Sequence, residues 1–250
     1  MKKAVIIFKT ETILFVRDFF GFFFTFAFPV LMLLLFGSIY GNEPTPYFNG
    51  LGTIDVSVPA YSAMIVAVTG LMAFPLTIAS YKEKKIYKRF DATPTGKGLV
   101  MTVQAMVNLF MTVIGFSLLF IIGKLVYDIK IQGYWLPIAL ALLLSIAAIF
   151  SLGFFFTAVS PTTKINNLLC YFSYFIMIFL SGATIPKEIF PEAIIKVSKL
   201  LPLTHVVELL QGTFRGAPFK EYGGSLILLL SLMIVCVAAG AFLYRKKSWL

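Results

Sequence analysis

Long uncharged windows, separated by short polar segments, dominate the pattern of hydrophobic and polar positions along the chain. Six windows hold between 22 and 33 consecutive residues without Asp, Glu, Lys or Arg. A helix needs about 20 apolar residues to cross the hydrocarbon core of a bilayer, so each window can span it once. The pattern predicts an all-α integral membrane fold, with residues 1–250 forming a single domain. The six predicted spans are residues 19–41, 58–81, 99–123, 135–160, 165–185 and 223–244.

Composition agrees with this pattern and excludes several classes of protein. Of the 250 residues, 59% are hydrophobic and 13% are charged, which is about half the charged fraction of an ordinary globular chain. Disorder, coiled coils and nucleic-acid binding are excluded on these figures. Both cysteines, Cys170 and Cys236, lie inside apolar windows, so a disulfide framework is unsupported. One histidine and no cysteine cluster argue against a metal site.

The basic residues are distributed unequally among the segments that connect the spans. With the N-terminus inside, the inner segments hold 14 Lys and Arg residues and the outer segments hold 7. Inner segments of membrane proteins carry the excess of Lys and Arg. The sequence therefore predicts that both termini face the cytoplasm. The net charge of +10 is interpreted as a signal for orientation in the membrane and not for nucleic-acid binding.

Residues 1–18 are predicted to form an amphipathic helix on the inner membrane surface. One helical face carries Val5, Phe8, Thr12, Phe15 and Val16, and the opposite face carries Lys3, Thr10 and Arg17. Such a helix lies in the interface, where its cations meet anionic lipid headgroups. A frayed basic leader is the alternative.

Two connecting segments differ from simple loops. Residues 82–97 are the most polar stretch, and a helix there should end before Pro94, because the residue preceding proline avoids the helical conformation. On physical grounds alone this segment is a solvated, positively charged inner loop. Residues 186–215 carry Pro186, Pro191 and Pro202 between short apolar stretches. These stretches are too short to cross, so they predict helices that re-enter the membrane from the outer face.

Polar chemistry inside the windows is sparse. Gln104, Asn108 and Thr112 recur every four residues and share one helical face. They either form hydrogen bonds between helices of one subunit or line a pathway or subunit interface. The absence of ionisable residues within the windows argues against proton- or ion-coupled carriers. The sequence has no GxxxxGK[ST] pattern, so ATP-driven work would need a separate subunit.

Two motifs, taken together with six spans, resemble the membrane subunits of ABC transporters of the ABC-2 (type-2 export) class, which includes small drug-export permeases. Glu83, Ile86, Phe90 and Pro94 fall on that family's pattern E-x-G-[TI]-x-x-x-L-x-x-x-P, and Lys85 stands where glycine is usual. The second motif follows span 5. It comprises Phe179-Leu180-Ser181-Gly182 and then Pro202, Thr204, His205 and Glu208, which are similar to the family's L-P-x-[ST]-[YH] signature.

The resemblance implies a dimer of permeases, homodimeric or heterodimeric, with two copies of an ABC ATPase subunit that binds ATP and Mg. It implies no cofactor and no catalytic residue in this chain, and a multi-pass location in the plasma (inner) membrane of a bacterium. The residues expected to couple to the ATPase are Glu83, Lys85, Ile86, Lys88, Arg89, Phe90 and Pro94. The residues expected at an outer gate and re-entrant region are Ser181, Gly182, Pro186, Pro191, Pro202, His205 and Glu208.

Alternative functions stay open at this point. A membrane-embedded enzyme acting on lipid would use His205 and Glu208 as its polar pair. A membrane scaffold or sensor without transport, and a permease that exports polysaccharide, are further alternatives. The apolar, aromatic spans favour export of an amphipathic substrate, such as a drug, an antimicrobial peptide or a lipid-like molecule.

Overall fold

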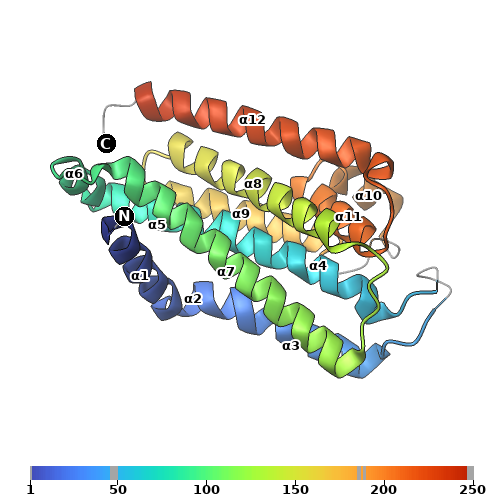
Figure 1. Cartoon of the computed structure of the whole chain (residues 1–250). Helices are drawn as coiled ribbons and strands as arrows, with labels where there is room; N and C mark the ends of the chain where they lie inside the picture. The colour runs from blue at the N-terminus through green and yellow to red at the C-terminus, as the bar shows by residue number, and fades with distance from the viewer. Residues whose placement is uncertain (1, 46–49, 185–186, 188–189, 247–250) are drawn as a thin grey trace.

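Helices make up every regular element in the described part of the chain (Figure 1). The computed structural model describes residues 2–45, 50–184, 187 and 190–246. Among these residues, six helical stretches are long and apolar enough to cross a membrane. The predicted all-α fold with six spans is therefore confirmed. Pro186, predicted to belong to the outer region, lies outside the described residues.

The spans are built from single helices or from helices joined end to end. The first consists of α2 (Phe19–Phe22), η1 (Phe23–Ala27) and α3 (Phe28–Tyr40). The second consists of α4 (Thr53–Val68), η3 (Thr69–Ala73) and α5 (Phe74–Glu83). The next three are α7 (Gly96–Tyr127), α8 (Trp135–Val159) and α9 (Thr163–Leu180), and the sixth joins η5 (Phe219–Tyr222) to α12 (Gly223–Lys246).

Several helices extend beyond the uncharged windows. α4 begins at Thr53 and places Asp55 in its first turn, where a carboxylate is favoured by the helix dipole. α7 continues past Lys124 to Tyr127, because a lysine near a helix C-terminus is favoured for the same reason. The charged residues limit the uncharged windows, whereas the helices continue a few residues beyond these charges.

Four shorter helices complete the described part of the chain: α1 (Lys2–Arg17), α6 (Ile86–Asp91), α10 (Glu192–Ser198) and α11 (Pro202–Phe214). The six spans alternate in direction, so α1, α6 and the last turn of α12 lie at one end of the bundle (Figure 1). We call this the α6 end. The opposite end, which carries α10 and α11, is the α11 end. That the α6 end faces the cytoplasm remains the prediction from Lys and Arg.

Proline shapes the first two spans in the same way. In each, a five-residue π-helical turn directly precedes a Phe-Pro pair, Phe28-Pro29 in one and Phe74-Pro75 in the other. Proline lacks the amide proton of the helical ladder, and a local widening of the helix accommodates it inside a membrane. Next to this widened turn a second helix contacts the backbone directly, since the Pro75 carbonyl accepts a hydrogen bond from Asn166 on α9.

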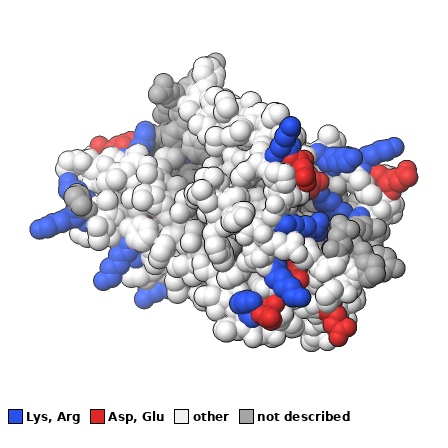
Figure 2. All heavy atoms as spheres, turned by 45° about the vertical axis from the view of Figure 1, so that its right-hand side comes forward, with Lys and Arg blue, Asp and Glu red and all other residues white. Residues whose placement is uncertain are grey.

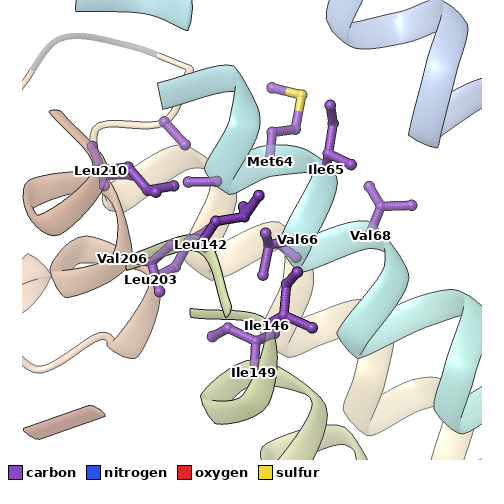
Figure 3. Packing of buried hydrophobic residues seen from close by; sticks show 14 of the residues in the cluster. Met64, Ile65, Val66, Val68, Leu142, Ile146, Ile149, Leu203, Val206 and Leu210 are labelled. Atoms are coloured by element: carbon purple, nitrogen blue, oxygen red, sulfur yellow. The ribbon is translucent and has the colours of Figure 1, made fainter. Parts of the chain in front are cut away.

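The second span is the centre of the bundle. Nearly all side chains of α4 are buried. In Figure 3, side chains of α4, α8 and α11 point toward one another, among them Val66, Ile146 and Val206. The backbones approach closely where α8 crosses η3, because a side chain at Gly153 would overlap the carbonyl group of Gly70. Small residues permit this close packing of helices in membranes.

The outer surface of the bundle is apolar. The spans around α4 expose large hydrophobic side chains, and Figure 2 shows a broad uncharged surface between groups of charged residues. α12 packs along α8 and leaves residues such as Ile227 and Phe242 exposed. In water so large an apolar surface would cause aggregation, whereas lipid tails cover it without penalty.

Helix α1 differs from the sequence prediction in the face that it buries. It packs against α7 through Ala4, Phe8, Glu11 and Phe15, which follow the helical period. Val5, predicted to belong to the same apolar face, is exposed. Two adjacent faces of α1 carry apolar side chains. α7 covers one of these faces, and the other is exposed and available to the membrane surface.

Candidate functional site

The coupling residues predicted from the sequence lie in the α6 segment, residues 82–97. The second span ends at Glu83, the chain turns at Lys84 and Lys85, and α6 begins at Ile86. α6 ends at Asp91, so the prediction that the helix stops before Pro94 is confirmed. The Asp91 carboxylate closes the segment because it accepts a hydrogen bond from the backbone N–H of Lys97 and pairs with its ammonium group at 3.1 Å.

The α6 segment has an exposed cationic side and a buried side. The side chains of Glu83, Lys85, Lys88, Arg89 and Pro94 are exposed. Those of Ile86 and Phe90 are half-buried, and that of Tyr87 is buried. α6 packs against α5 and α7. The segment is therefore a short rigid element that presents positive charge to its surroundings while its other face is attached to the ends of two spans.

Lys85 occupies the position at which the related motif has glycine. Its backbone dihedrals are φ 56° and ψ 25°, in the left-handed region that favours glycine. The turn that glycine would permit is thus present, and lysine adopts it at an energetic cost of about 1–2 kcal/mol. The departure from the motif changes the side chain and leaves the local backbone turn intact.

A pocket of about 210 Å³ lies beside the α6 segment. Its walls come from the α5–α6 turn, with Lys85 and Lys88, and from the α8–α9 turn, with Pro161 and Thr162. Lys82 joins the two walls, because its ammonium group donates to the carbonyl oxygens of Thr157 and Ser160 at 3.2 and 3.3 Å. The pocket is partly open and is large enough for a side chain of a partner protein.

The stripe on α7 is buried within the subunit. Gln104 contacts α6 and α1, since its side-chain oxygen accepts from the Tyr87 hydroxyl at 2.6 Å and its amide donates to Glu11 at 3.3 Å. The Thr112 hydroxyl lies 2.8 Å from that of Thr69 on η3. Asn108 donates to the backbone oxygen of Gln104, and its own side-chain oxygen has no partner in the described structure. This geometry supports the internal hydrogen-bonding alternative for Gln104 and Thr112.

The residues predicted for an outer gate are partly brought together at the α11 end. α9 ends at Leu180, and Ser181 and Gly182 follow as buried residues. Pro191 precedes α10, and Pro202 is the first residue of α11, where its missing amide proton is harmless. α11 packs against α4, α8, α9 and α12, so protein covers it on several sides.

His205 and Glu208 join a network that ties α11 to two other segments. Glu208 forms an ion pair of 2.7 Å with Lys187 and accepts a hydrogen bond of 3.0 Å from the Ser225 hydroxyl. His205 Nδ1 lies 2.9 Å from Ser225 Oγ, and His205 Nε2 lies 2.9 Å from the carbonyl oxygen of Lys199. Lys187 follows α9 and Ser225 lies on α12, so the network joins the last two spans through α11.

Electrostatics show how this network is protonated. Burial alone would raise the pKa of Glu208, but hydrogen bonds from His205, Lys187 and Ser225 outweigh it and lower this pKa to about 2. The hydrogen bond to Glu208 raises the pKa of His205, against the opposing effect of burial. Because the Ser225 proton goes to Glu208 and the Lys199 carbonyl can only accept, both ring nitrogens of His205 are placed to donate, as in the imidazolium form.

This arrangement is unsuited to the enzyme alternative. A nucleophilic serine needs a basic ring nitrogen to take its proton. Here the nitrogen nearest Ser225 is positioned as a donor, and Glu208 already accepts the serine proton. No group of three or more potential metal ligands occurs among the described residues. The geometry of the network is therefore that of a structural ion cluster.

A second polar cluster at the α11 end was not predicted. The buried Asp55 carboxylate accepts hydrogen bonds from Asn42 and from the backbone N–H groups of Gly52 and Lys130, at 2.9–3.0 Å. It thereby joins the α3–α4 connection to the α7–α8 connection. The sequence offered one signal, since an aspartate three residues after Gly52 at the start of a helix is typical of N-terminal capping.

The other residues that sequence reasoning missed are Glu11, Tyr87, Lys187 and Ser225. Glu11 could have been found from its spacing, since it is the only acidic residue in positions 1–17 and lies four residues from Ile7 and Phe15. Lys187 and Ser225 carry no local signal. Their importance comes from Glu208, which is 21 and 17 residues away from them.

Comparison with known proteins accords with this architecture. A search of curated proteins finds no matching sequence. A comparison with protein families matches residues 3–214, from α1 through α11, to the ABC-2 type transporter family. The match includes the α6 segment, His205 and Glu208, and it ends before Ser225. Six spans, a helix that precedes them and the extent of this match lead to one conclusion: the chain is a multi-pass membrane protein that belongs to the ABC-2 type transporter family.

Proposed function

We propose that the chain is the permease of an ATP-driven exporter and that the α6 segment is its contact with a separate ABC ATPase. The observation that supports this proposal most is the form of that segment. Lys88 and Arg89 are exposed on one side of α6, while Tyr87 anchors the other side to α7. A partner that moves α6 would therefore also move the span to which it is attached.

The chemistry of the surface indicates what the partner presents. The exposed cations of α6 and the adjoining pocket favour a surface with acidic side chains. Two such permeases, identical or different, would bind two ATPase subunits, which hold the ATP and Mg. Lipid and the second permease would then cover the apolar faces of the spans.

Cross-linking tests this contact. In a background with Cys170 and Cys236 replaced, single cysteines at positions 86–92 should cross-link to the ATPase in the purified complex. Cysteine at Lys220, which is exposed at the α11 end, is the matched control and should not react with it. The proposal fails if only the control position, or no position in α6, is cross-linked in a complex that transports.

Function of the α6 segment can be tested separately from binding. Glu83 is exposed, so Glu83→Ala should leave folding intact and lower transport. Phe90→Ala should also lower transport, with some loss of stability because Phe90 is half-buried against the core. Normal transport by both variants, at normal expression, would argue against a role in coupling.

We assign the outer gate to the end of α9 together with α10 and α11, as short helices that re-enter from the outer face. The burial of α11 among four other helices supports this assignment, because re-entrant backbone must be covered by protein. In a dimer, two such regions would meet at the symmetry axis. Phe179→Cys is the test, since Phe179 is about half exposed on the last turn of α9.

The expected result is a cross-link between two permeases in the resting state. Leu125→Cys provides the control, since Leu125 is highly exposed at the same end of the bundle on α7. A cross-link at 125 without one at 179 would move the interface to another face of the subunit.

An amphipathic substrate, such as a drug, an antimicrobial peptide or a lipid-like molecule, suits the exposed surface of the spans. The exposed face of α9 carries Phe172, Phe175 and Phe179, which offer aromatic contacts and no charge. A glycan would need many polar partners instead. The test is stimulation of ATP hydrolysis by candidate substrates in the complex reconstituted in bacterial plasma-membrane lipids. Stimulation by an oligosaccharide alone would support the polysaccharide alternative.

A further inference from the structure

Glu11 is a buried carboxylate in a helix that otherwise meets its neighbours through apolar side chains. It is 8% exposed, whereas the charged residues Lys3, Lys9 and Arg17 of the same helix are exposed. Around it lies an apolar layer formed by residues of α1, η1, η3 and α7. These residues are Phe15, Phe26, Ala73, Val103, Val107 and Met111. Docking of α1 on α7 would need no carboxylate at this position.

Hydrogen bonds from two other elements compensate the burial of Glu11. The Gln104 amide on α7 donates to Glu11 at 3.3 Å, and Tyr81 near the end of α5 also donates to it. Burial raises the pKa of Glu11, and these two hydrogen bonds oppose the rise. Buried carboxyl groups are costly unless such donors are present, so their placement is specific.

Gln104 connects Glu11 to the α6 segment through a second hydrogen bond. Its side chain has one acceptor end and one donor end, and here the two ends have different partners. The donor end is directed to Glu11 on α1, while the acceptor end receives the Tyr87 hydroxyl of α6 at 2.6 Å. Gln104 and Tyr87 are each only 1% exposed, so water does not compete for these bonds. The orientation of the amide therefore links the position of α1 to that of α6.

Aromatic packing strengthens the link. The rings of Tyr81 and Tyr87 lie 5.8 Å apart, so the two tyrosines that flank the α5–α6 turn face each other across the network. Contacts of this kind contribute about 0.5–1.5 kcal/mol beyond burial. α1, the end of α5, α6 and the start of α7 are thus held together by one buried cluster, which we call the Glu11 cluster: Glu11, Tyr81, Tyr87 and Gln104.

We propose that Glu11 is a positioning residue, which sets the orientation of the α6 segment through Gln104 and Tyr87 and so makes α1 part of the coupling apparatus. This inference rests on the proposed function of the α6 segment as the ATPase contact. In the predicted topology α1 lies along the membrane surface. The Glu11 cluster would therefore hold α6, the helix that faces the ATPase, at a fixed position relative to the inner leaflet. A purely apolar contact would allow α1 to slide or rotate, because such contacts lack direction.

The first test needs no ATPase. Spin labels at Lys3 and Lys88, both exposed, report the distance between α1 and α6 in the purified permease. Glu11→Leu should broaden the distance distribution, whereas Lys9→Gln, an exposed change on the same helix, should leave it narrow. Glu11→Gln retains an acceptor oxygen for Gln104 or Tyr81 and should restore most of the narrow distribution. Equal distributions for Glu11→Leu and Lys9→Gln would overturn the proposal, whatever the ATPase does.

The second test measures coupling in the complete complex. Loss of one net hydrogen bond corresponds to a roughly 2- to 10-fold change in an equilibrium. Glu11→Leu should lower the amount of substrate moved per ATP hydrolysed by a factor in this range, while binding of the ATPase persists. A merely structural role would lower expression or thermal stability and leave this ratio unchanged. If the wild-type permease binds no ATPase, the proposed function fails, and the spin-label result still decides whether the Glu11 cluster orients α6.

Tyr87→Phe provides a variant that keeps the ring and removes only the hydroxyl. It should broaden the same distance and lower the same ratio, because it breaks the link to Gln104 from the other side. In a double-mutant cycle, Tyr87→Phe should add little in a Glu11→Leu background. Full additivity of the two effects would show that Glu11 and Tyr87 act independently and would overturn the proposal. This variant also keeps the test decisive if Glu11→Leu fails to fold.

Discussion

The two ends of the bundle are stabilised by different polar chemistry. At the α11 end, an ion pair of Lys187 and Glu208, reinforced by His205 and Ser225, joins the last two spans. At the α6 end, the Glu11 cluster has hydrogen bonds and a tilted pair of aromatic rings but no ion pair among its members. The Glu11 cluster therefore has directional contacts without an ion pair, whereas the network around Glu208 has both.

This difference suits the parts that the ends play in the proposed mechanism. A gate that stays closed at rest needs contacts that resist separation, and charge-assisted hydrogen bonds are the stronger kind. A coupling element must move as a unit when a partner moves it, which needs orientation more than strength. Substitutions at each end test this difference, and their expected effects differ in size.

The largest effect is expected for Glu208→Ala at the α11 end. The change leaves Lys187 and His205 without their carboxylate partner. A hydrogen-bonded charge of this kind contributes about 2 kcal/mol, a value already reduced because Glu208 is partly exposed. The free energy of unfolding in detergent should fall by about that amount. Glu221→Ala, at an exposed position nearby, is the matched control and should change stability little.

An equal response of the two variants would show that the network at the α11 end contributes no more than surface charge. The polar contacts at the two ends of the bundle would then not differ in strength. The transport assay adds a second criterion, since loosening a gate should also raise leakage of substrate in the absence of ATP.

The sequence predicted the six spans and the C-terminal end of α6 because each depends on local chemistry. A bilayer requires long uncharged helices, and a proline limits the helix before it. Pro94 and the six windows could be found without knowledge of the fold. The same is true of the Gln104, Asn108 and Thr112 stripe, whose helical period alone places it on one face.

The partners of those residues could not be predicted, because they depend on which helices become neighbours. Glu11 and Gln104 are separated by 93 residues in the chain, and no local pattern connects them. Gly182 shows the same limit in another form. Its place after span 5 predicts a gate residue, but nothing in the local sequence predicts that the Lys187 side chain lies beside it.

The second largest effect is expected for Gly182→Leu. Gly182 has a φ of +85°, which glycine adopts freely, and a Cβ there would come within 2.7 Å of the Lys187 side chain. Leucine should therefore lower stability by about 1–2 kcal/mol through backbone strain, and it should also disturb the Lys187–Glu208 ion pair. Export should fall while assembly of the dimer persists.

Gly182→Asn separates these causes, since asparagine tolerates the left-handed region better than leucine. Asparagine should recover part of the stability. If Gly182→Asn and Gly182→Leu are equally harmful and the Lys187–Glu208 pair is intact in both, contact with a second subunit would be the better explanation.

A smaller effect is expected from pH, and its sign follows from the two pKa shifts. The pKa of Glu208 falls from 4.5 to about 2 on folding, so its contribution is present above 4.5 and is lost as pH decreases toward 2. The pKa of His205 rises above its ordinary value of 6.5, so its contribution is present below 6.5 and is lost as pH increases through the raised value. The contribution of this network to the unfolding temperature should therefore be largest between pH values of about 4.5 and 6.5.

His205→Gln tests the alkaline part of this profile. The variant should lose the decline in unfolding temperature above neutral pH and keep the acidic decline caused by Glu208. Persistence of the alkaline decline in His205→Gln would assign it to another group and remove His205 from the network's electrostatics.

The smallest effect is expected at the α6 end, for Lys85→Gly. Lys85 adopts the left-handed conformation at a cost of about 1–2 kcal/mol, which glycine would relieve, and the greater freedom of glycine in the unfolded chain offsets about 0.5–1 kcal/mol of that gain. The free energy of unfolding should therefore increase by about 0.5–1 kcal/mol. Lys84→Gly is the matched control: with φ −73° that residue carries no such strain, so glycine there should only destabilise. Lys85→Ala removes the same charge and retains the strained turn, so it should not reproduce the gain. A gain in Lys85→Ala equal to that in Lys85→Gly would mean that relief of charge repulsion at the α6 end, and not the backbone, is responsible.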